Sequence, residues 1–385
     1  MAKTRVVLKL QFPLCFFLLL IAPAVFAESD ARAVSAAAEL AASLNDSDLA
    51  AQVLITGIDG RQRPVPAMRA LLERMPAGGI MFFRYNLDTS AGEVKALISE
   101  TGRISAGRTG ILPFMAVDHE GGYVHRFGAV AERLPSAFYF WELAQKAGQA
   151  PALAQAGIMY TRSAREIGEL GINMVLGPVA EILDRENEIF LETRSYGPSA
   201  DFVQAAASVY IKSMDSAGIV SVVKHFPGNT STDPHTGISV LRAEKPALDE
   251  MVKPFAGIIS GLNVPAIMLS HVMVPAVDGR RNASLSRVII ENWLRGELGF
   301  NGIVIADDFS MGAVTDSGLS HEAAAVEALN AGVDMIMVWP RNLAPVHASI
   351  LRALNNGALS RDRLLEAAQR IIREKIRYGI INIPE

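Results

Sequence analysis

The hydrophobic residues of this chain cluster in eight short runs, separated by longer stretches with helical spacing of apolar residues. The runs are rich in Val, Ile and Met, which is typical of strands buried on both faces of a parallel sheet. They lie within residues 50–58, 78–86, 111–122, 172–182, 218–228, 265–275, 302–311 and 333–340. This pattern predicts an α/β fold built on eight buried strands.

The stretches between the runs predict helices with recognisable ends. One opens at Ser320, a residue suited to an N-cap, and ends at Gly332, and the last helix opens at Ser360. Eight alternations of strand and helix predict a single (β/α)8 TIM-like barrel, with a helix over residues 31–44 added before it. An open doubly wound sheet is the alternative, but no G-x-G-x-x-G turn follows a strand.

The first 27 residues differ from the rest of the chain. A basic start, a short apolar core and small residues before a polar one are typical of a secretory signal peptide, which we expect to be cleaved after Ala27. An uncleaved anchor helix is the alternative, but Pro13 and Pro23 interrupt the apolar stretch. The predicted organisation is therefore a signal peptide at 1–27 and a barrel domain at 28–385 of an exported, periplasmic or secreted protein.

Composition limits the possible partners. Half of the 385 residues are hydrophobic and 20% are charged, as expected of a globular protein with a large core. The formal net charge of -4 and the lack of a basic stripe give no support for nucleic-acid binding. The only cysteine, Cys15, lies in the predicted signal peptide, so we expect no disulfide in the barrel. We expect a monomer with no membrane association after cleavage.

Polar residues gather at the carboxyl ends of the predicted strands. They are Asp118, His119, Glu120, Glu181, Asp184, Lys224, His225, His271, Asp307 and Asp308. In a (β/α)8 barrel this face carries the active site. The segment "KHFPGNTSTDPHTG" at 224–237 would then be the loop after the fifth strand. Gly228 and Gly237 lead us to expect a mobile flap, since glycine tolerates many backbone conformations.

Three acidic residues have distinct possible roles. Asp307 ends the seventh run and can serve as a nucleophile, a general base or a metal ligand, or be a structural carboxylate paired with a basic residue. Its neighbour Asp308 suits a helix N-cap or first-turn position. Asp233 can orient His235 as an acid/base catalyst if the segment turns, or both can simply belong to a solvated turn.

Two further possibilities concern ligands. Arg194 follows the fourth run, where its guanidinium can hold sugar hydroxyls or form a surface salt bridge. Metal binding competes for the same histidines. His225 and His235 are separated by a Pro/Gly-containing loop rather than one helical turn, and no cysteine assists. We therefore expect no metal and no cofactor.

Six segments together carry a more specific pattern. They are "DHEGGYVHRF" at 118–127, "NMVLGPVAEI" at 173–182, "RSYG" at 194–197, "KHFPGN" with "DPH" at 224–235, "SHV" at 270–272 and "ADDFSM" at 306–311. In this order the chain resembles glycoside hydrolase family 3, in particular its single-domain β-N-acetylglucosaminidases. The family forms of two segments read D-Q-E-G-G-R-V-x-R-F and K-H-F-P-G-H-G with D-S-H. The resemblance runs from about residue 47 to 375.

The resemblance implies roles for individual residues. Asp307 would be the catalytic nucleophile, and Asp233 with His235 the acid/base dyad. The sugar-binding residues would be Asp118, Arg194, Lys224, His225, His271 and Met311. Because the chain ends after the eighth helix, without the second domain that carries a glutamate acid/base in the β-glucosidase members, we expect the acid to come from the barrel.

This sequence departs from the family pattern at the loop. The segment from Lys224 to Asp233 is shorter, "HG" after Pro-Gly is replaced by Asn229 and Thr230, and Pro234 replaces a serine. Glu181 stands where the family has Asp. The resemblance implies a retaining β-N-acetylhexosaminidase acting on oligosaccharides or muropeptides, with a role in cell-wall turnover. The alternatives are a phosphorolytic enzyme and an exported sugar-binding barrel that has lost catalysis.

Overall fold

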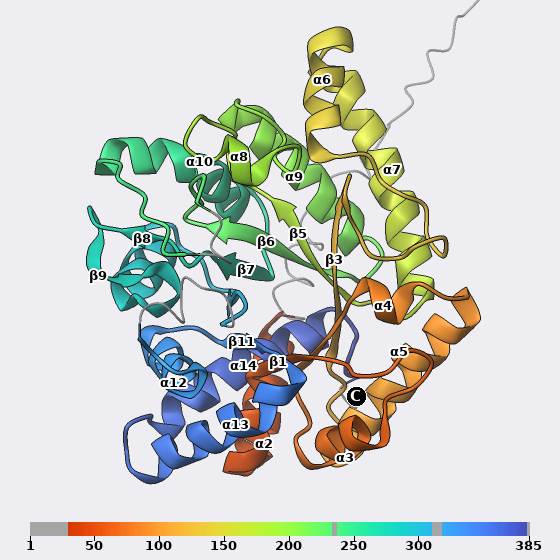
Figure 1. Ribbon diagram of the computed structural model, residues 1–385, viewed down its shortest axis with the longest axis vertical. Coiled ribbons are helices and arrows are strands. Elements are labelled where there is room, and N and C mark those ends of the chain that lie inside the picture. The colour runs from red at the N-terminus through yellow and green to blue at the C-terminus, as the bar shows by residue number, and fades with distance from the viewer. Residues whose placement is uncertain (1–29, 233–236, 310–317, 383–385) are drawn as a thin grey trace, which may run out of the picture.

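The computed structural model describes residues 30–232, 237–309 and 318–382. Eight parallel strands form a closed barrel (Figure 1). They are β1 (Leu54–Gly57), β2 (Gly79–Phe82), β3 (Phe114–Gly121), β5 (Met174–Val179), β6 (Val220–Phe226), β7 (Ala266–Leu269), β10 (Ile303–Ala306) and β11 (Met335–Val338). Each strand pairs with its neighbours in the sequence, and β1 pairs with β11 to close the ring. The predicted barrel is confirmed, and the open doubly wound sheet is wrong.

Helices surround the barrel in Figure 1. They are α2 (Asp46–Gln52), α3 (Pro66–Arg74), α4 (Arg84–Leu87), α5 (Ala91–Ala106), α6 (Ala137–Ala147), α7 (Gln149–Glu169), α8 (Glu188–Leu191), α9 (Ala200–Asp215), α10 (Lys245–Gly261), the π-helix η2 (Val288–Glu297), α12 (His321–Ala331), α13 (Pro340–Asn355) and α14 (Arg361–Arg377). Residues 30–43 are also helical. The predicted caps are confirmed, because the side chains of Ser320 and Ser360 accept hydrogen bonds from the backbone N–H groups of Ala323 and Arg363. 

Small elements extend the loops that follow the strands. They are β4 (Val124–His125), β8 (Met273–Val274), β9 (Asp278–Asn282) and the 3-10 turn η1 (Ala283–Leu285). β4 forms a hairpin with the end of β3, and β8 pairs with β9. No helix among the described residues has the length and apolar composition to cross a membrane.

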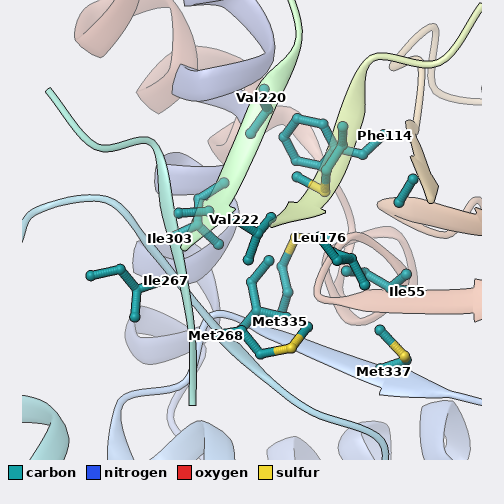
Figure 2. Close-up of a cluster of buried hydrophobic side chains, with 14 of the residues drawn as sticks. Ile55, Phe114, Leu176, Val220, Val222, Ile267, Met268, Ile303, Met335 and Met337 are labelled. Atoms are coloured by element: carbon teal, nitrogen blue, oxygen red, sulfur yellow. The ribbon is translucent and has the colours of Figure 1, made fainter. Parts of the chain in front are cut away.

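The barrel interior is a packed hydrophobic core. The short strands are buried along their whole length, as the continuous apolar runs predicted. Figure 2 shows part of this cluster, in which Leu176, Val222, Met268 and Met335 come from four different strands. Because such a core fills the barrel, a ligand site must lie beyond the strand ends, where side chains of the loops project.

Candidate active site

A cavity of about 330 Å³ lies at the carboxyl ends of the strands. Its volume is near the lower end of the range of about 300–1,000 Å³ for small-molecule sites, so it suits one sugar unit. The lining includes six residues predicted from the sequence: Asp118, Arg194, Lys224, His225, His271 and Asp307. The predicted residues Asp233, His235 and Met311 lie outside the described residues.

Strand geometry selects which residues of β3 face the cavity. Side chains alternate along a strand, so Asp118 and Glu120 point into the cavity and His119 points the opposite way. The His119 ring is fully buried and lies 2.7 Å from the hydroxyl of Ser163 on α7. Burial lowers the pKa of His119 to about 3. His119 is therefore a neutral packing residue, although it belongs to the same motif.

A buried ammonium group joins the two carboxylates of β3. The Nζ of Lys224, at the end of β6, lies 3.0 Å from Asp118 Oδ1 and 2.6 Å from Glu120 Oε1. Arg194 holds Glu120 through two hydrogen bonds, from Nε at 2.8 Å and Nη2 at 2.9 Å. Arg194 therefore belongs to the same network as Asp118 and Lys224, and Glu120 is the group that connects them.

Arg126 belongs to the same network and was not predicted. In the hairpin of β3 and β4, His119 pairs with His125, so Asp118 and Arg126 come opposite each other on the face toward the cavity. Arg126 Nη2 donates a hydrogen bond to Asp118 Oδ2 at 3.0 Å. The two glycines that follow Glu120 were the available signal, because Gly121 and Gly122 have φ of 94° and 58° and turn the chain back.

The cations determine the charge state of the two acids. Burial alone would raise the pKa of Asp118 and of Glu120, but Lys224 and the arginines outweigh burial and hold both pKa values below their ordinary range. Burial likewise opposes the charge of Lys224, yet the two carboxylates raise its pKa. Asp118 and Glu120 are therefore permanent hydrogen-bond acceptors at neutral pH and are unsuited to donate a proton as a general acid.

A second carboxylate anchors the beginning of the loop after β6. Glu181 accepts hydrogen bonds from His225 Nδ1 at 2.6 Å and from the backbone N–H of Asn229 at 2.6 Å. Thr230 and Ser239, both buried, join the two sides of the loop through a 2.6 Å hydrogen bond. Asn229 and Thr230, at the start of the expected flap, are therefore held by polar contacts in this structure, and the mobility of the flap stays a prediction.

The opposite side of the cavity carries Asp307 at the end of β10. Asp307 Oδ1 accepts a hydrogen bond from the backbone N–H of Asp308 at 2.8 Å. Asp308 Oδ2 accepts a hydrogen bond from Trp339 Nε1 at 2.5 Å. Trp339 stacks on Phe83 with ring centroids 4.9 Å apart, and both rings line the cavity. The ring of Trp339 therefore forms part of the cavity wall.

His271 contacts the backbone next to Asp307. Its Nε2 lies 3.2 Å from the carbonyl oxygen of Asp308 and its Nδ1 lies 2.8 Å from Ser284 Oγ. Burial lowers its pKa, although Asp307 opposes the shift. Because protein groups use both ring nitrogens, His271 holds the Asp307–Asp308 segment in place. Among the described residues, no group of three or more His, Cys, Asp or Glu is placed to hold a metal.

Similarity to known proteins assigns the chain to a family. The profile of the glycosyl hydrolase family 3 N terminal domain matches residues 47–374. A β-hexosaminidase of Methylococcus capsulatus is 33% identical over 298 residues, which cover 76% of this chain and 84% of the relative. A β-hexosaminidase of Psychromonas ingrahamii is 33% identical over 288 residues, covering 74% and 81%.

Solved structures give the same result. A family 3 β-N-acetylglucosaminidase from Paenibacillus sp. str. FPU-7 superposes with a TM-score of 0.82 at 28% identity. The match covers 89% of this chain and 64% of that chain, so the Paenibacillus chain is considerably longer. A glycosyl hydrolase of the same family from Mycobacterium smegmatis has a TM-score of 0.75 at 27% identity, and the match covers 87% of this chain and 98% of that chain.

Proposed function

Because the chain belongs to glycoside hydrolase family 3 and is a glycoside hydrolase of the β-N-acetylhexosaminidase type, we propose that it removes terminal β-linked N-acetylglucosamine with retention of configuration. The substrates are oligosaccharides from cell walls or chitin. Asp307 attacks the anomeric carbon, a covalent glycosyl-enzyme forms, and water releases the sugar.

The observation that carries this proposal is that a network of paired charges and the carboxylate of Asp307 line the same cavity. β3 and β10 lie four strands apart in the ring of eight, so they face each other across the barrel. The network of Asp118, Glu120 and Lys224 offers fixed donors and acceptors for sugar hydroxyls on one side. Asp307 faces the same cavity from the other side, where the anomeric carbon of a single bound sugar would lie.

The remaining role is that of the proton donor. Asp118 and Glu120 are held ionised, and both oxygens of Glu181 accept hydrogen bonds from protein groups. These constraints favour a donor from elsewhere, and His235 oriented by Asp233 is our proposal. A histidine avoids the repulsion that a second carboxylate would experience beside Asp307. It protonates the leaving oxygen and then takes a proton from the incoming water.

The reaction is tested with a chromogenic N-acetyl-β-glucosaminide and with NMR of the first-formed anomer. We expect turnover that is lost in Asp307→Ala, and initial release of the β-anomer. Initial release of the α-anomer would exclude retention. Equal background for the wild type and the variant would instead support a sugar-binding barrel without catalysis. The same measurement in phosphate buffer would reveal a phosphorolytic enzyme by formation of a sugar phosphate.

The acid/base dyad is tested by the choice of leaving group. His235→Ala should lose roughly 10²–10⁴-fold in kcat on a natural disaccharide, the usual size of general acid catalysis. The loss should be much smaller on a nitrophenyl glycoside, because nitrophenolate leaves without protonation. A variant that keeps full activity on the disaccharide would contradict the assignment.

We also propose that the enzyme works outside the cytoplasm after cleavage behind Ala27. The pattern of basic, apolar and small residues in the first 27 positions motivates this proposal. Amino-terminal sequencing of the protein recovered from cell fractions tests it. A chain that retains residue 1 and remains with the cytoplasmic fraction would contradict it.

A further inference from the structure

Two departures from the family pattern lie in direct contact. Glu181 stands where the pattern has Asp, and Asn229 stands where the pattern has His. The two positions are 48 residues apart in the sequence, yet the Asn229 backbone N–H and side-chain Nδ2 both donate to the Glu181 carboxylate, at 2.6 and 3.0 Å. Glu181, one methylene longer than Asp, thus reaches both donors of Asn229, whose side chain is shorter than that of His.

Glu181 and Asn229 lie next to His225, which lines the cavity. His225 Nδ1 lies 2.6 Å from Glu181 Oε1, and all three side chains are nearly inaccessible to solvent, with exposures of 5% for His225, 2% for Glu181 and 1% for Asn229. Because a carboxylate oxygen accepts hydrogen bonds, this contact places a ring proton of His225 on Nδ1. Within the described residues no hydrogen bond reaches Nε2, and His225 lines the cavity. Nε2 is therefore the ring atom left to contact a ligand.

We propose that Glu181 and Asn229 are matched positioning residues for sugar recognition. Glu181 holds His225 in the tautomer whose Nε2 accepts a hydrogen bond from a sugar hydroxyl, and Asn229 holds Glu181 in place. The second role follows from the backbone contact. The N–H of Asn229 ties the start of the loop that carries Asp233 and His235 to the carboxylate that orients His225. The inference rests on the proposed function for the identity of the ligand.

The side-chain environment distinguishes this role from simple packing. Glu181 has no Lys or Arg partner at salt-bridge distance among the described residues, in contrast to Glu120, which has both. Its hydrogen bonds come from His225 and from the loop. Its placement is explained by the orientation of the imidazole, as with histidines held by carboxylates elsewhere.

The primary test is the tautomer of His225, read by nitrogen NMR of histidine-labelled protein and assigned with His225→Asn. In the wild type the proton should reside on Nδ1. In Glu181→Gln the new amide can donate to Nδ1, so the proton should move to Nε2. We expect kcat/KM to fall roughly 3–10-fold, the value of one hydrogen bond between neutral groups, with an unchanged melting temperature. Glu186→Gln, an exposed acid in the same loop, is the matched control and should equal the wild type.

The second test is a swap toward the family pattern. Glu181→Asp and Asn229→His should each lower kcat/KM roughly 10-fold, because one leaves a gap and the other a clash. The double variant should recover most of the loss. Additive losses in the double variant, or a wild-type tautomer in Glu181→Gln, would overturn the proposal. An inactive wild type with the expected tautomer change would contradict the proposed function and leave the positioning role intact.

Discussion

Two lysines of this barrel are buried to the same extent but have opposite electrostatic surroundings. Lys224, 2% exposed, lies at the carboxyl end of β6 between Asp118 and Glu120. Lys375, fully buried on α14, donates to the neutral side chain of Gln52 at 3.0 Å and lies 5.2 Å from the centre of the Phe114 ring. Phe114 begins β3, so Lys375 lies at the amino end of the barrel.

The pKa values of the two lysines separate accordingly. For Lys224 the two carboxylates outweigh burial and raise the pKa above 10.5. For Lys375 burial acts without a compensating charge and lowers the pKa to about 7. Burial therefore does not determine the charge of a lysine by itself. The end of the barrel that carries the cavity has paired charges, whereas at the other end Lys375 carries its charge at a cost.

The largest difference between Lys224 and Lys375 should appear when each ammonium group is removed by substitution with methionine. Lys224→Met removes the cation shared by Asp118 and Glu120 and, on the proposed function, a donor to sugar hydroxyls. We expect kcat/KM to fall by about 100-fold or more and the free energy of unfolding to fall by about 3–5 kcal/mol. Steady-state kinetics and urea unfolding measure the two effects. Lys375→Met is the matched control, with kcat/KM expected at the wild-type level. If both variants lost activity equally, the comparison would fail.

A somewhat smaller effect is expected when the surroundings of Lys224 are made more like those of Lys375. Glu120→Gln should lower the free energy of unfolding by about 3 kcal/mol at pH 7, since Lys224 and Arg194 lose a shared anion. The pKa of Glu120 in the folded state lies below its ordinary 4.5. The stabilising contribution of the Glu120 carboxylate is thus complete above pH 4.5 and is lost as the pH falls toward the pKa of the folded state. The deficit of the variant should shrink in acid, and a deficit independent of pH would contradict this assignment.

The pH dependence due to Lys375 should be opposite in sign to that due to Lys224, because burial lowers the pKa of Lys375 whereas the carboxylates raise the pKa of Lys224. Its pKa is about 7 in the folded state and 10.5 ordinarily, so between these values the unfolded chain binds more protons and stability rises with pH. Below pH 7 the folded state bears the cost of a buried charge. We expect the free energy of unfolding of the wild type, minus that of Lys375→Met, to increase by roughly 2–4 kcal/mol between pH 6.5 and 10.5. Urea unfolding of both proteins across this pH range measures the difference. Stability curves that run parallel against pH for the wild type and Lys375→Met would disprove the prediction.

The smallest effect should follow at an exposed lysine. Lys253 on α10 lies 3.8 Å from Asp201 and 3.9 Å from Glu250, with all three side chains at least half exposed. Water and salt weaken such pairs, so Lys253→Met should change the free energy of unfolding by no more than about 0.5 kcal/mol. A loss as large as that of Lys224→Met would show that pairing alone, irrespective of burial, explains the difference between the two buried lysines.

The amino-acid sequence by itself determined the barrel. A sheet with one solvent-exposed face has strands in which apolar and polar residues alternate. The eight apolar runs lack this alternation, so each was predicted to be a strand covered on both faces. Strand polarity then placed Asp118, Lys224 and Asp307 at one end, because parallel strands share the face where their carboxyl ends meet. The predictions for Asp233, His235 and the signal peptide concern residues beyond the described ranges and stay predictions.

Only the tertiary structure decided which charged groups meet. Arg194 and Glu120 are 74 residues apart in the sequence, and Lys224 and Asp118 are 106 apart. No local pattern encodes such pairs, nor the contact of Glu181 with Asn229. The charge of a buried group depends on the distance to its partners and on the water excluded around it. Both quantities exist only once the chain has folded, which is why the sequence identified residues that line the cavity but left their electrostatics open.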